Sequence, residues 1–387
     1  MILPLQLPRT LFARNAISAL PEELAALGIG RPLLVADRGV VRAGLIAKVV
    51  AALGDTISPV LFDEVTENPI FTDADRGATI YKREGCDGII ALGGGSVIDT
   101  AKCIALLAAN PGTIADYALV PDARLNGAAA LIAIPTTAGT GSEADIHAGI
   151  HPDPMSSSAG VSSPYLLPRL AILDPELTIS LPPRLTAVTG IDAISHCVEA
   201  YLSRHDVPLA KLIALDGVAR GMRYIRRAVA DGNDVEARSE MMLVAFSGGV
   251  AMSMGTGPAH AIAITCSDQG FQHGLLSGIG MVMALDGMVA RQPARGAALA
   301  QAMGAVQSVP LGATVAALMR ELGLPASLRE LGYKVKDLNA VAEAVHRNFC
   351  NLFAFYHPTA AEYAEMISTS LNAYESLSED SEVRGAN

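Results

Sequence analysis

The sequence predicts a doubly wound α/β domain with a parallel sheet, followed by an all-helical domain. In the first half, short β-branched apolar runs alternate with helical patterns, which is typical of a parallel sheet covered on both faces. Beyond about residue 182 the strand pattern disappears and nearly every segment has helical spacing. A chain of 387 residues also favours two hydrophobic cores over one, so we divide it into residues 1–182 and 183–387.

The elements of the first half alternate along the chain. Each predicted strand is a continuous apolar run, and each predicted helix repeats its apolar residues every three or four positions. In chain order we predict the strand Pro32–Ala36, the helix Val40–Leu53, the strand Pro59–Phe62, the helix Thr72–Glu84, the strand Gly88–Leu92, the helix Ser96–Ala109, and the strands Ala129–Ile134 and Ala171–Leu173. This alternation indicates a doubly wound sheet.

The second half is predicted to be helical throughout. The turn-rich pairs Asp174-Pro175 and Pro182-Pro183 end the strand pattern. The helical segments that follow are Thr186–Leu202, Leu209–Ala230, Ala237–Met254, His273–Ala290, Leu311–Leu322 and Ala360–Tyr374.

Charge and composition exclude several classes of partner. The chain has 28 Lys and Arg against 39 Asp and Glu, a formal net charge of −11, and no basic cluster longer than Arg226-Arg227. Nucleic-acid binding is therefore disfavoured. Every apolar run is broken by a charge, Pro or Gly before the roughly 18 residues of a membrane span, and the N-terminus lacks a basic leader. The five cysteines are scattered without a CxxC pair, which favours reduced thiols and a cytoplasmic location.

Two glycine- and hydroxyl-rich loops follow predicted strands. Gly93–Ser96 opens a helix directly after a strand, so its backbone N–H groups and the helix N-terminus can bind a pyrophosphate, with Ser96 as a cap. Ile134–Glu143 offers four hydroxyls and two glycines after the next strand. Such a pair suits the crevice where dinucleotides lie, although each could be a plain turn. Asp37 follows the first predicted strand, where a carboxylate accepts from a ribose hydroxyl and repels a 2′-phosphate, so NAD is favoured over NADP.

A possible metal site lies in the second half. Asp192 and His196 are four residues apart, on one face of a predicted helix, and His260 and His273 follow further along. One carboxylate and three imidazoles can hold a divalent transition metal and leave room for substrate or water. An Asp and a His at this spacing are also common as a surface pair on a helix. The apolar neighbours of His196 and His260 favour the metal, because an unpartnered imidazole there is costly.

Four ordered motifs carry a family resemblance. They are GGGSVIDTAK (93–102), PTTAGTGSE (135–143), DPELTISLPP (174–183) and TGIDAISHCVEAYLS (189–203). Together they resemble the iron-containing, group III alcohol dehydrogenase family, from about residue 10 to residue 375. The resemblance implies a dinucleotide-binding domain, a helical domain, a divalent metal in the cleft between them, usually iron and sometimes zinc, and a homo-oligomer of two or more subunits.

The resemblance also assigns roles to particular residues. The implied metal ligands are Asp192, His196, His260 and His273. The implied cofactor contacts are Gly94, Gly95 and Ser96 at the pyrophosphate, Thr136, Thr137 and Thr140 in the second loop, Leu177 near the adenosine, and Asp99 in the first motif, which Lys102 completes.

Three departures from the family pattern affect the substrate side. Ile264 stands where relatives usually carry a histidine, four residues after the third ligand. Gln272-His273 replaces a common Pro-His pair, which makes His273 the weakest assignment of the four. The strip 144–168 contains no Lys or Arg, so an anionic substrate finds no obvious partner there.

These observations predict a metal-dependent oxidoreductase that transfers a hydride between NAD(H) and a small primary alcohol or aldehyde. An ω-hydroxy acid such as 4-hydroxybutyrate, with its semialdehyde, is the alternative substrate. A metal-free maleylacetate reductase would not need Asp192, and a dehydroquinate synthase-like lyase would need several basic residues in the cleft. A binding protein without catalysis would not need the complete ligand set.

Overall fold

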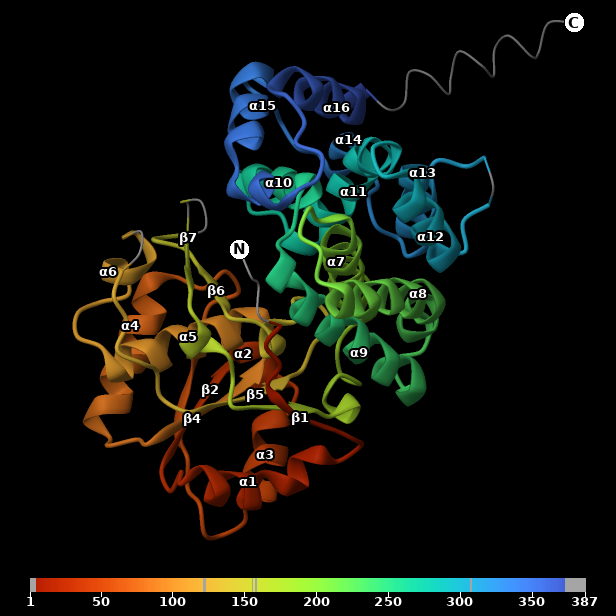
Figure 1. Cartoon of the computed structure of the whole chain (residues 1–387). Coiled ribbons are helices and arrows are strands. Elements are labelled where there is room, and N and C mark those ends of the chain that lie inside the picture. Colours follow the sequence, from red (N-terminus) through yellow and green to blue (C-terminus); the bar gives the residue numbers. More distant parts are fainter. Residues whose placement is uncertain (1–4, 121–122, 155, 157–158, 307, 373–387) are drawn as a thin grey trace, which may run out of the picture.

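The computed structural model describes residues 5–120, 123–154, 156, 159–306 and 308–372. A sheet flanked by helices forms one part of the molecule and a group of helices forms the other (Figure 1). The predicted fold class is confirmed. The boundary near residue 182 remains a prediction; α7 begins at Pro183, directly after it.

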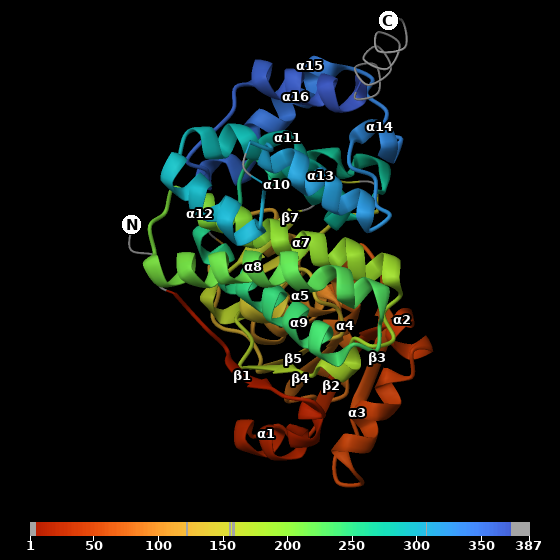
Figure 2. The ribbon, with the colours of Figure 1, turned by 90° about the vertical axis from the view of Figure 1, so that its right-hand side faces the viewer.

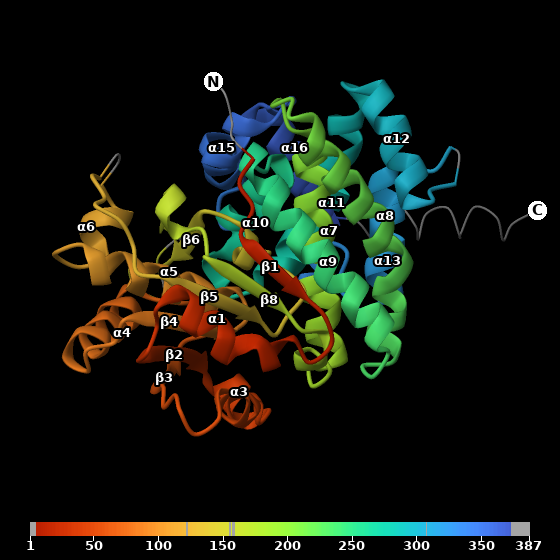
Figure 3. The same ribbon diagram turned by 60° about the horizontal axis from the view of Figure 1, so that its bottom comes forward.

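Within the described residues, the main sheet has six parallel strands in the order β1-β8-β5-β4-β2-β3. Their bounds are β1 Arg9–Phe12, β2 Pro32–Asp37, β3 Val60–Val65, β4 Gly88–Gly93, β5 Leu131–Pro135 and β8 Leu170–Leu173. Sequence analysis missed β1, which lies beside β8 at the edge of the sheet (Figure 3). It is four residues long and partly exposed, so it lacks the continuous buried run that identified the other strands.

Successive side chains of the central strands point to opposite faces of the sheet and pack into two separate hydrophobic cores. Leu33, Ile89 and Leu131 pack on one side with α4 (Phe71–Arg83) and α5 (Gly95–Ala109). Their neighbours Leu34, Ile90 and Ile132 pack on the other with α1 (Leu20–Leu27) and α3 (Leu45–Leu53). The strands are thus covered on both faces, which explains why they read as unbroken apolar runs.

Two local differences from the sequence prediction have a clear cause. The predicted helix Val40–Leu53 is two helices, α2 (Arg38–Arg42) and α3, separated by Gly44 at φ +71°. This left-handed conformation favours glycine and ends a helix. A hairpin of β6 (His147–Ile150) and β7 (Ala159–Ser162), together with the short helix α6 (Ala115–Ala118), was not predicted, because these segments are short and weakly patterned.

The helical domain is built around α7. Its described helices are α7 Pro183–Leu202, α8 Pro208–Ala230, α9 Val235–Ala251, α10 Pro258–Thr265, α11 His273–Ala290, α12 Pro293–Met303, α13 Leu311–Glu321, α14 Leu328–Leu331, α15 Leu338–Arg347 and α16 Ala360–Asn372. The helix predicted to reach Tyr374 is described only to Asn372, and Tyr374 lies outside the described residues. Figure 2 shows α7 and α8 between the sheet domain and the layer that contains α10, α11 and α13.

The helix α11 is long and apolar enough to cross a membrane by length and composition alone. Its 18 residues have a mean hydropathy of 1.4, but 61% of the segment is buried inside the protein. Burial of this kind is also found in the core helix of a soluble protein, and α11 packs between α7, α10 and α13.

The two domains meet where the second glycine-rich loop contacts α9. Gly141 has φ +69°, and a Cβ there would lie 2.4 Å from the Ala245 carbonyl oxygen and 2.6 Å from the Gly249 nitrogen. On the same helix, a Cβ at Gly248 would lie 3.0 Å from Cβ of His196. Two adjacent glycines of α9 therefore hold the loop of one domain close to the helix that carries His196.

Candidate metal and cofactor site

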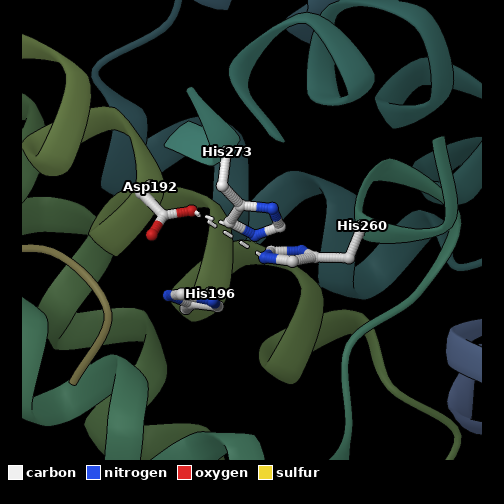
Figure 4. Close-up of side chains that lie close together, drawn as sticks. All are labelled: Asp192, His196, His260 and His273. Carbon is white, nitrogen blue, oxygen red and sulfur yellow. Dashed lines mark ion pairs between the residues drawn. The ribbon is translucent and has the colours of Figure 1, made fainter. Parts of the chain in front are cut away.

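Four side chains from three helices converge in the helical domain. Asp192 and His196 come from α7, His260 from α10, and His273 from the first position of α11 (Figure 4). One potential ligand atom from each lies within 4.8 Å of the others. The Oδ1 atom of Asp192 is 4.0 Å from Nε2 of His260 and 3.8 Å from Nε2 of His273. The structure thus brings together all four residues that the sequence singled out.

The donor set fits a divalent transition metal. Asp192, His196 and His260 are 3–5% exposed, whereas the His273 side chain is 42% exposed. Within the described residues, Nδ1 of His196 and Nε2 of His260 are buried and have no hydrogen-bond partner. Buried polar atoms are normally paired, and a group of three imidazoles and one carboxylate matches the ligands that such a metal requires.

Electrostatics favour an ionised Asp192 beside neutral imidazoles at His196 and His273. Burial opposes ionisation of Asp192, but the three histidines and a hydrogen bond from Ser277 outweigh it and lower its pKa. Burial lowers the pKa of His196 to about 4, and the pKa of His273 is lowered as well. Metal ligation requires these same deprotonated forms.

Two residues that contact the ligands were missed by sequence analysis. Glu199 accepts a hydrogen bond from Nδ1 of His260 at 2.6 Å, and Ser277 donates one to Oδ1 of Asp192 at 2.8 Å. Burial lowers the basicity of His260, but Glu199 and Asp192 outweigh it and raise its pKa. Glu199 stands three residues after His196 on the same helix, so the spacing could have revealed it. No sequence spacing or motif points to Ser277.

The first glycine-rich loop has the geometry of an anion site. The helix α5 begins at Gly95 with Gly94 as its N-cap, and no side chain caps it. Ser96 was predicted as the cap, which is wrong, because its hydroxyl instead donates to the carbonyl of Glu67. The N-terminal N–H groups of a helix without a side-chain cap carry partial positive charge, which suits a phosphate.

The two loops lie against each other. A Cβ added at Gly95 would be 2.5 Å from Cγ2 of Thr140, and one at Gly94 would be 3.3 Å from the Thr137 side chain. Thr136 is buried and its N–H donates to the carbonyl of Gly93 at 3.0 Å. The predicted pyrophosphate residues and the threonines of the second loop are therefore neighbours.

Three other residues that were predicted to bind the cofactor make contacts within the protein. Asp37 ends β2 and accepts from the N–H of Val40, so it caps α2. Leu177 is 1% exposed and packs in the core beneath the sheet. Asp99 accepts from the N–H of Gly149 at 2.9 Å. These contacts do not test a role in cofactor binding, which stays a prediction for each.

Lys102 lies at the centre of a second buried cluster. Its fully buried ammonium group is 2.5 Å from Oδ1 of Asp145, 2.5 Å from the carbonyl of His147 and 3.8 Å from Oδ1 of Asp99. Burial raises the pKa of Asp99 to about 6 and that of nearby Glu143 to about 7. Lys102, at the end of the first motif, is thus the counter-ion of buried carboxylates inside the domain.

Two residues near the candidate metal ligands bear on the predicted substrate side. Ile264 lies on α10 one turn after His260 and packs against the core of the helical domain. On the facing domain, the charge of His151 contributes to the lowered pKa of His273. Nδ1 of His151 bonds the carbonyl of Ser156 at 2.9 Å.

Two models of one protein family together match most of the chain. Residues 8–175 match the family model "Iron-containing alcohol dehydrogenase", and residues 186–371 match "Fe-containing alcohol dehydrogenase family, C-terminal". The chain is 38% identical to 4-hydroxybutyrate dehydrogenase of Cupriavidus necator, over 92% of this chain and 96% of that protein. It is 30% identical to NAD-dependent methanol dehydrogenase of Bacillus methanolicus, over 94% and 98%.

Solved structures show the same fold. The structure of 1,3-propanediol oxidoreductase superimposes with a TM-score of 0.91 at 29% identity, over 96% of this chain and 100% of that one. Sulfoacetaldehyde reductase from Bifidobacterium kashiwanohense, in complex with NAD+, superimposes with a TM-score of 0.89 at 25% identity, over 96% and 99%.

Proposed function

The chain belongs to the iron-containing alcohol dehydrogenase family, and on this premise we propose which of its residues bind the metal and NAD. It is an oxidoreductase that transfers a hydride between NAD(H) and a small alcohol or aldehyde. We assign the divalent metal, iron first and zinc second, to Asp192, His196, His260 and His273. We assign the cofactor to Asp37, Gly94, Gly95, Ser96, Asp99, Thr136, Thr137, Thr140 and Leu177.

The proposal rests mainly on two buried imidazole nitrogens without a hydrogen-bond partner, in residues whose potential ligand atoms lie within 4.8 Å of one another. Nδ1 of His196 and Nε2 of His260 are buried without a partner in the described part of the chain, and Asp192 lies within 4.0 Å of His260. When bound, a divalent metal supplies Lewis acidity, which stabilises the alkoxide form of an alcohol and polarises an aldehyde. The three buried ligand residues exclude water from one side of this position, whereas the exposed His273 leaves the other side open.

The cofactor side of the reaction depends on the two loops. The uncapped N-terminus of α5 binds the pyrophosphate, and Gly94 and Gly95 let the backbone approach it. Thr137 and Thr140 fix this loop from the side. Because Gly141 and Gly248-Gly249 hold the second loop near His196, the nicotinamide end of the cofactor can reach the metal ligands across the domain junction.

Metal removal tests the assignment. The full chain is dialysed against a chelator, Fe(II) or Zn(II) is added back, and NADH is followed with a panel of short aldehydes. We expect activity to be lost and then restored in proportion to bound metal. Full activity without metal would contradict the proposal and favour a maleylacetate reductase. Metal-dependent turnover without net NADH consumption would favour a dehydroquinate synthase-like lyase.

A second candidate substrate is 4-hydroxybutyrate with its semialdehyde. The full-length similarity to 4-hydroxybutyrate dehydrogenase favours it, whereas the lack of Lys and Arg in residues 144–168 favours a neutral substrate. The ratio of kcat/KM for 4-hydroxybutyrate and 1-butanol distinguishes the two. A ratio well above one assigns the hydroxy acid, and a ratio below one assigns the simple alcohol.

We also propose the cellular setting and organisation. The acidic charge and scattered cysteines favour a cytoplasmic enzyme without nucleic-acid or membrane partners. A homo-oligomer is expected from the family resemblance. Residues 1–182 and 183–387 are proposed as the cofactor and metal domains. Light scattering tests the oligomer, and limited proteolysis tests the boundary.

A further inference from the structure

Glu199 lies on the ligand-bearing face of α7. It follows Asp192 by seven residues and His196 by three, so the three side chains share one face of the helix. Glu199 is 1% exposed. A buried carboxylate is costly unless it is paired or hydrogen-bonded, so its partners indicate why it is there.

Four hydrogen bonds join the Glu199 carboxylate to the start of α10. Oε2 accepts from the N–H groups of Gly257 at 3.0 Å and His260 at 3.2 Å, and from Nδ1 of His260 at 2.6 Å. Oε1 accepts from the N–H of Ala259 at 2.7 Å. The N-cap residue Gly257 has no side chain to cap this helix. One carboxylate therefore caps α10 from α7 and also fixes the ring of a ligand on it.

The hydrogen bond to Nδ1 decides which nitrogen of His260 can bind a metal. A carboxylate accepts only, so Nδ1 carries the proton and Nε2 keeps its lone pair. Nε2 is the atom that is buried without a partner and faces Oδ1 of Asp192 at 4.0 Å. The ring is thus turned toward the other ligands.

We propose that Glu199 is the positioning residue of the metal site: it docks α10 onto α7 and holds His260 in the Nδ1–H tautomer, so that Nε2 is presented before any metal arrives. This inference rests on the proposed metal site. Outer carboxylates that orient a ligating histidine usually change metal affinity by about 10- to 100-fold when removed. Glu199 is neither a ligand nor a group that contacts substrate.

The test compares Glu199→Gln with a matched control in the full chain. Asp174 is also 1% exposed and accepts from three backbone N–H groups, those of Asn15, Ile17 and Glu176, but in the other domain. Zn(II) affinity is measured by chelator competition, and the visible spectrum of the Co(II)-loaded protein reports the ligand geometry. We expect Glu199→Gln to weaken Zn(II) binding about 10- to 100-fold and alter the spectrum, whereas Asp174→Asn lowers only the melting temperature.

A metal-free measurement separates this inference from the proposed function. Nitrogen-15 NMR of the histidine rings reports the tautomer in the apoprotein, with His260 assigned by its loss in His260→Gln. An Nδ1–H signal in the wild type that is lost in Glu199→Gln supports the inference even if no metal binds, an outcome that would overturn only the proposed function. An Nε2–H tautomer in the wild type, or unchanged Zn(II) affinity in folded Glu199→Gln, overturns the inference. If Glu199→Gln does not fold, the tautomer of His260 in the wild type still tests the inference, because an Nε2–H tautomer there would overturn it.

Discussion

In the part of the chain that the structure describes, each domain holds a buried cluster of ionisable groups, and the cost of burying these groups is offset differently in the two clusters. In the sheet domain, Lys102 lies among the carboxylates of Asp99, Glu143 and Asp145. In the helical domain, three histidines surround Asp192. Each cluster includes buried atoms without a hydrogen-bond partner in the described residues.

The difference lies in what can satisfy the unpaired atoms. The charge of a buried carboxylate can be balanced by an internal ammonium group or removed by a proton. Both are available in the Lys102 cluster, where burial raises the pKa values of Asp99 and Glu143. In the helical domain the unpaired atoms are imidazole nitrogens in a group that can hold a metal ion, so a cation from outside can satisfy them. The first cluster is therefore expected to stabilise the fold, and the second to bind metal.

The largest effect is expected in the helical domain. In His196→Ala, one of the buried ligands is lost, so we expect the metal to be lost and kcat/KM to fall about 10³-fold or more, since the Lewis acid contributes several kcal/mol. Metal content by atomic emission and steady-state kinetics check this. His205→Ala, at a half-buried histidine outside the cluster, is the control. One bound metal per chain with wild-type kcat in His196→Ala would contradict the assignment.

The opposite outcome is expected for the Lys102 cluster. Lys102→Met removes the ammonium group that pairs with the buried Asp145, and leaving such a charge unpaired costs about 3–5 kcal/mol. We expect a lower urea midpoint, measured by circular dichroism, with unchanged metal content in the folded fraction. Lys48→Met, at an exposed lysine of α3, controls for loss of a positive charge. Equal midpoints for the two variants would show that the cluster does not stabilise the fold.

A smaller effect is expected at the first glycine-rich loop, which we assign to the cofactor rather than the metal. A methyl group at Gly95 would meet Thr140 at 2.5 Å, so Gly95→Ala should displace the loop. We expect the Kd for NAD to rise about tenfold, a loss of roughly 1.4 kcal/mol, with metal affinity unchanged. Gly94→Ala, with contacts at 3.3 Å, should have a weaker effect. Calorimetric titration with NAD measures both. Equal Kd values for wild type and Gly95→Ala would remove this loop from the cofactor site.

The sequence predicted the elements whose pattern is local. The buried strands near Leu33, Ile89 and Ile132 were recognisable because both faces are covered. The four candidate metal ligands were predicted from the i, i+4 spacing of Asp192 and His196, from the apolar neighbours of His196 and His260, and from the family resemblance. The edge strand β1 and the β6–β7 hairpin were missed because partly exposed strands of four residues carry little pattern.

The contacts between distant segments could not be predicted. Lys102 was assigned to the cofactor motif, yet its partner Asp145 lies 43 residues away and is reached only when β6 folds back over α5. Ser277 reaches Asp192 across 85 residues. Glu199 is intermediate, because its spacing from His196 is visible in the sequence, whereas its hydrogen bonds to α10 depend on how two helices dock.

A further effect concerns the pH dependence of the Lys102 cluster. Burial raises the pKa of Glu143 from 4.5 to about 7, so between these values the folded protein binds more protons than the unfolded chain. The stabilisation is fully present below about pH 4.5 and is lost as pH rises through about 7. Glu143→Gln cannot ionise, so its stability should decline less over this window, by on the order of 1–3 kcal/mol.

Unfolding free energies of wild type and Glu143→Gln, measured at intervals from pH 5 to pH 8, check this expectation. The gap should open in favour of the variant as pH rises, while Glu22→Gln, at an exposed position on α1, follows the wild type. Asp99 titrates in both proteins, so a residual decline in the variant is expected near its pKa of about 6. Parallel curves for wild type and Glu143→Gln would mean that Glu143 is ionised throughout and that Lys102, rather than a proton, relieves its charge.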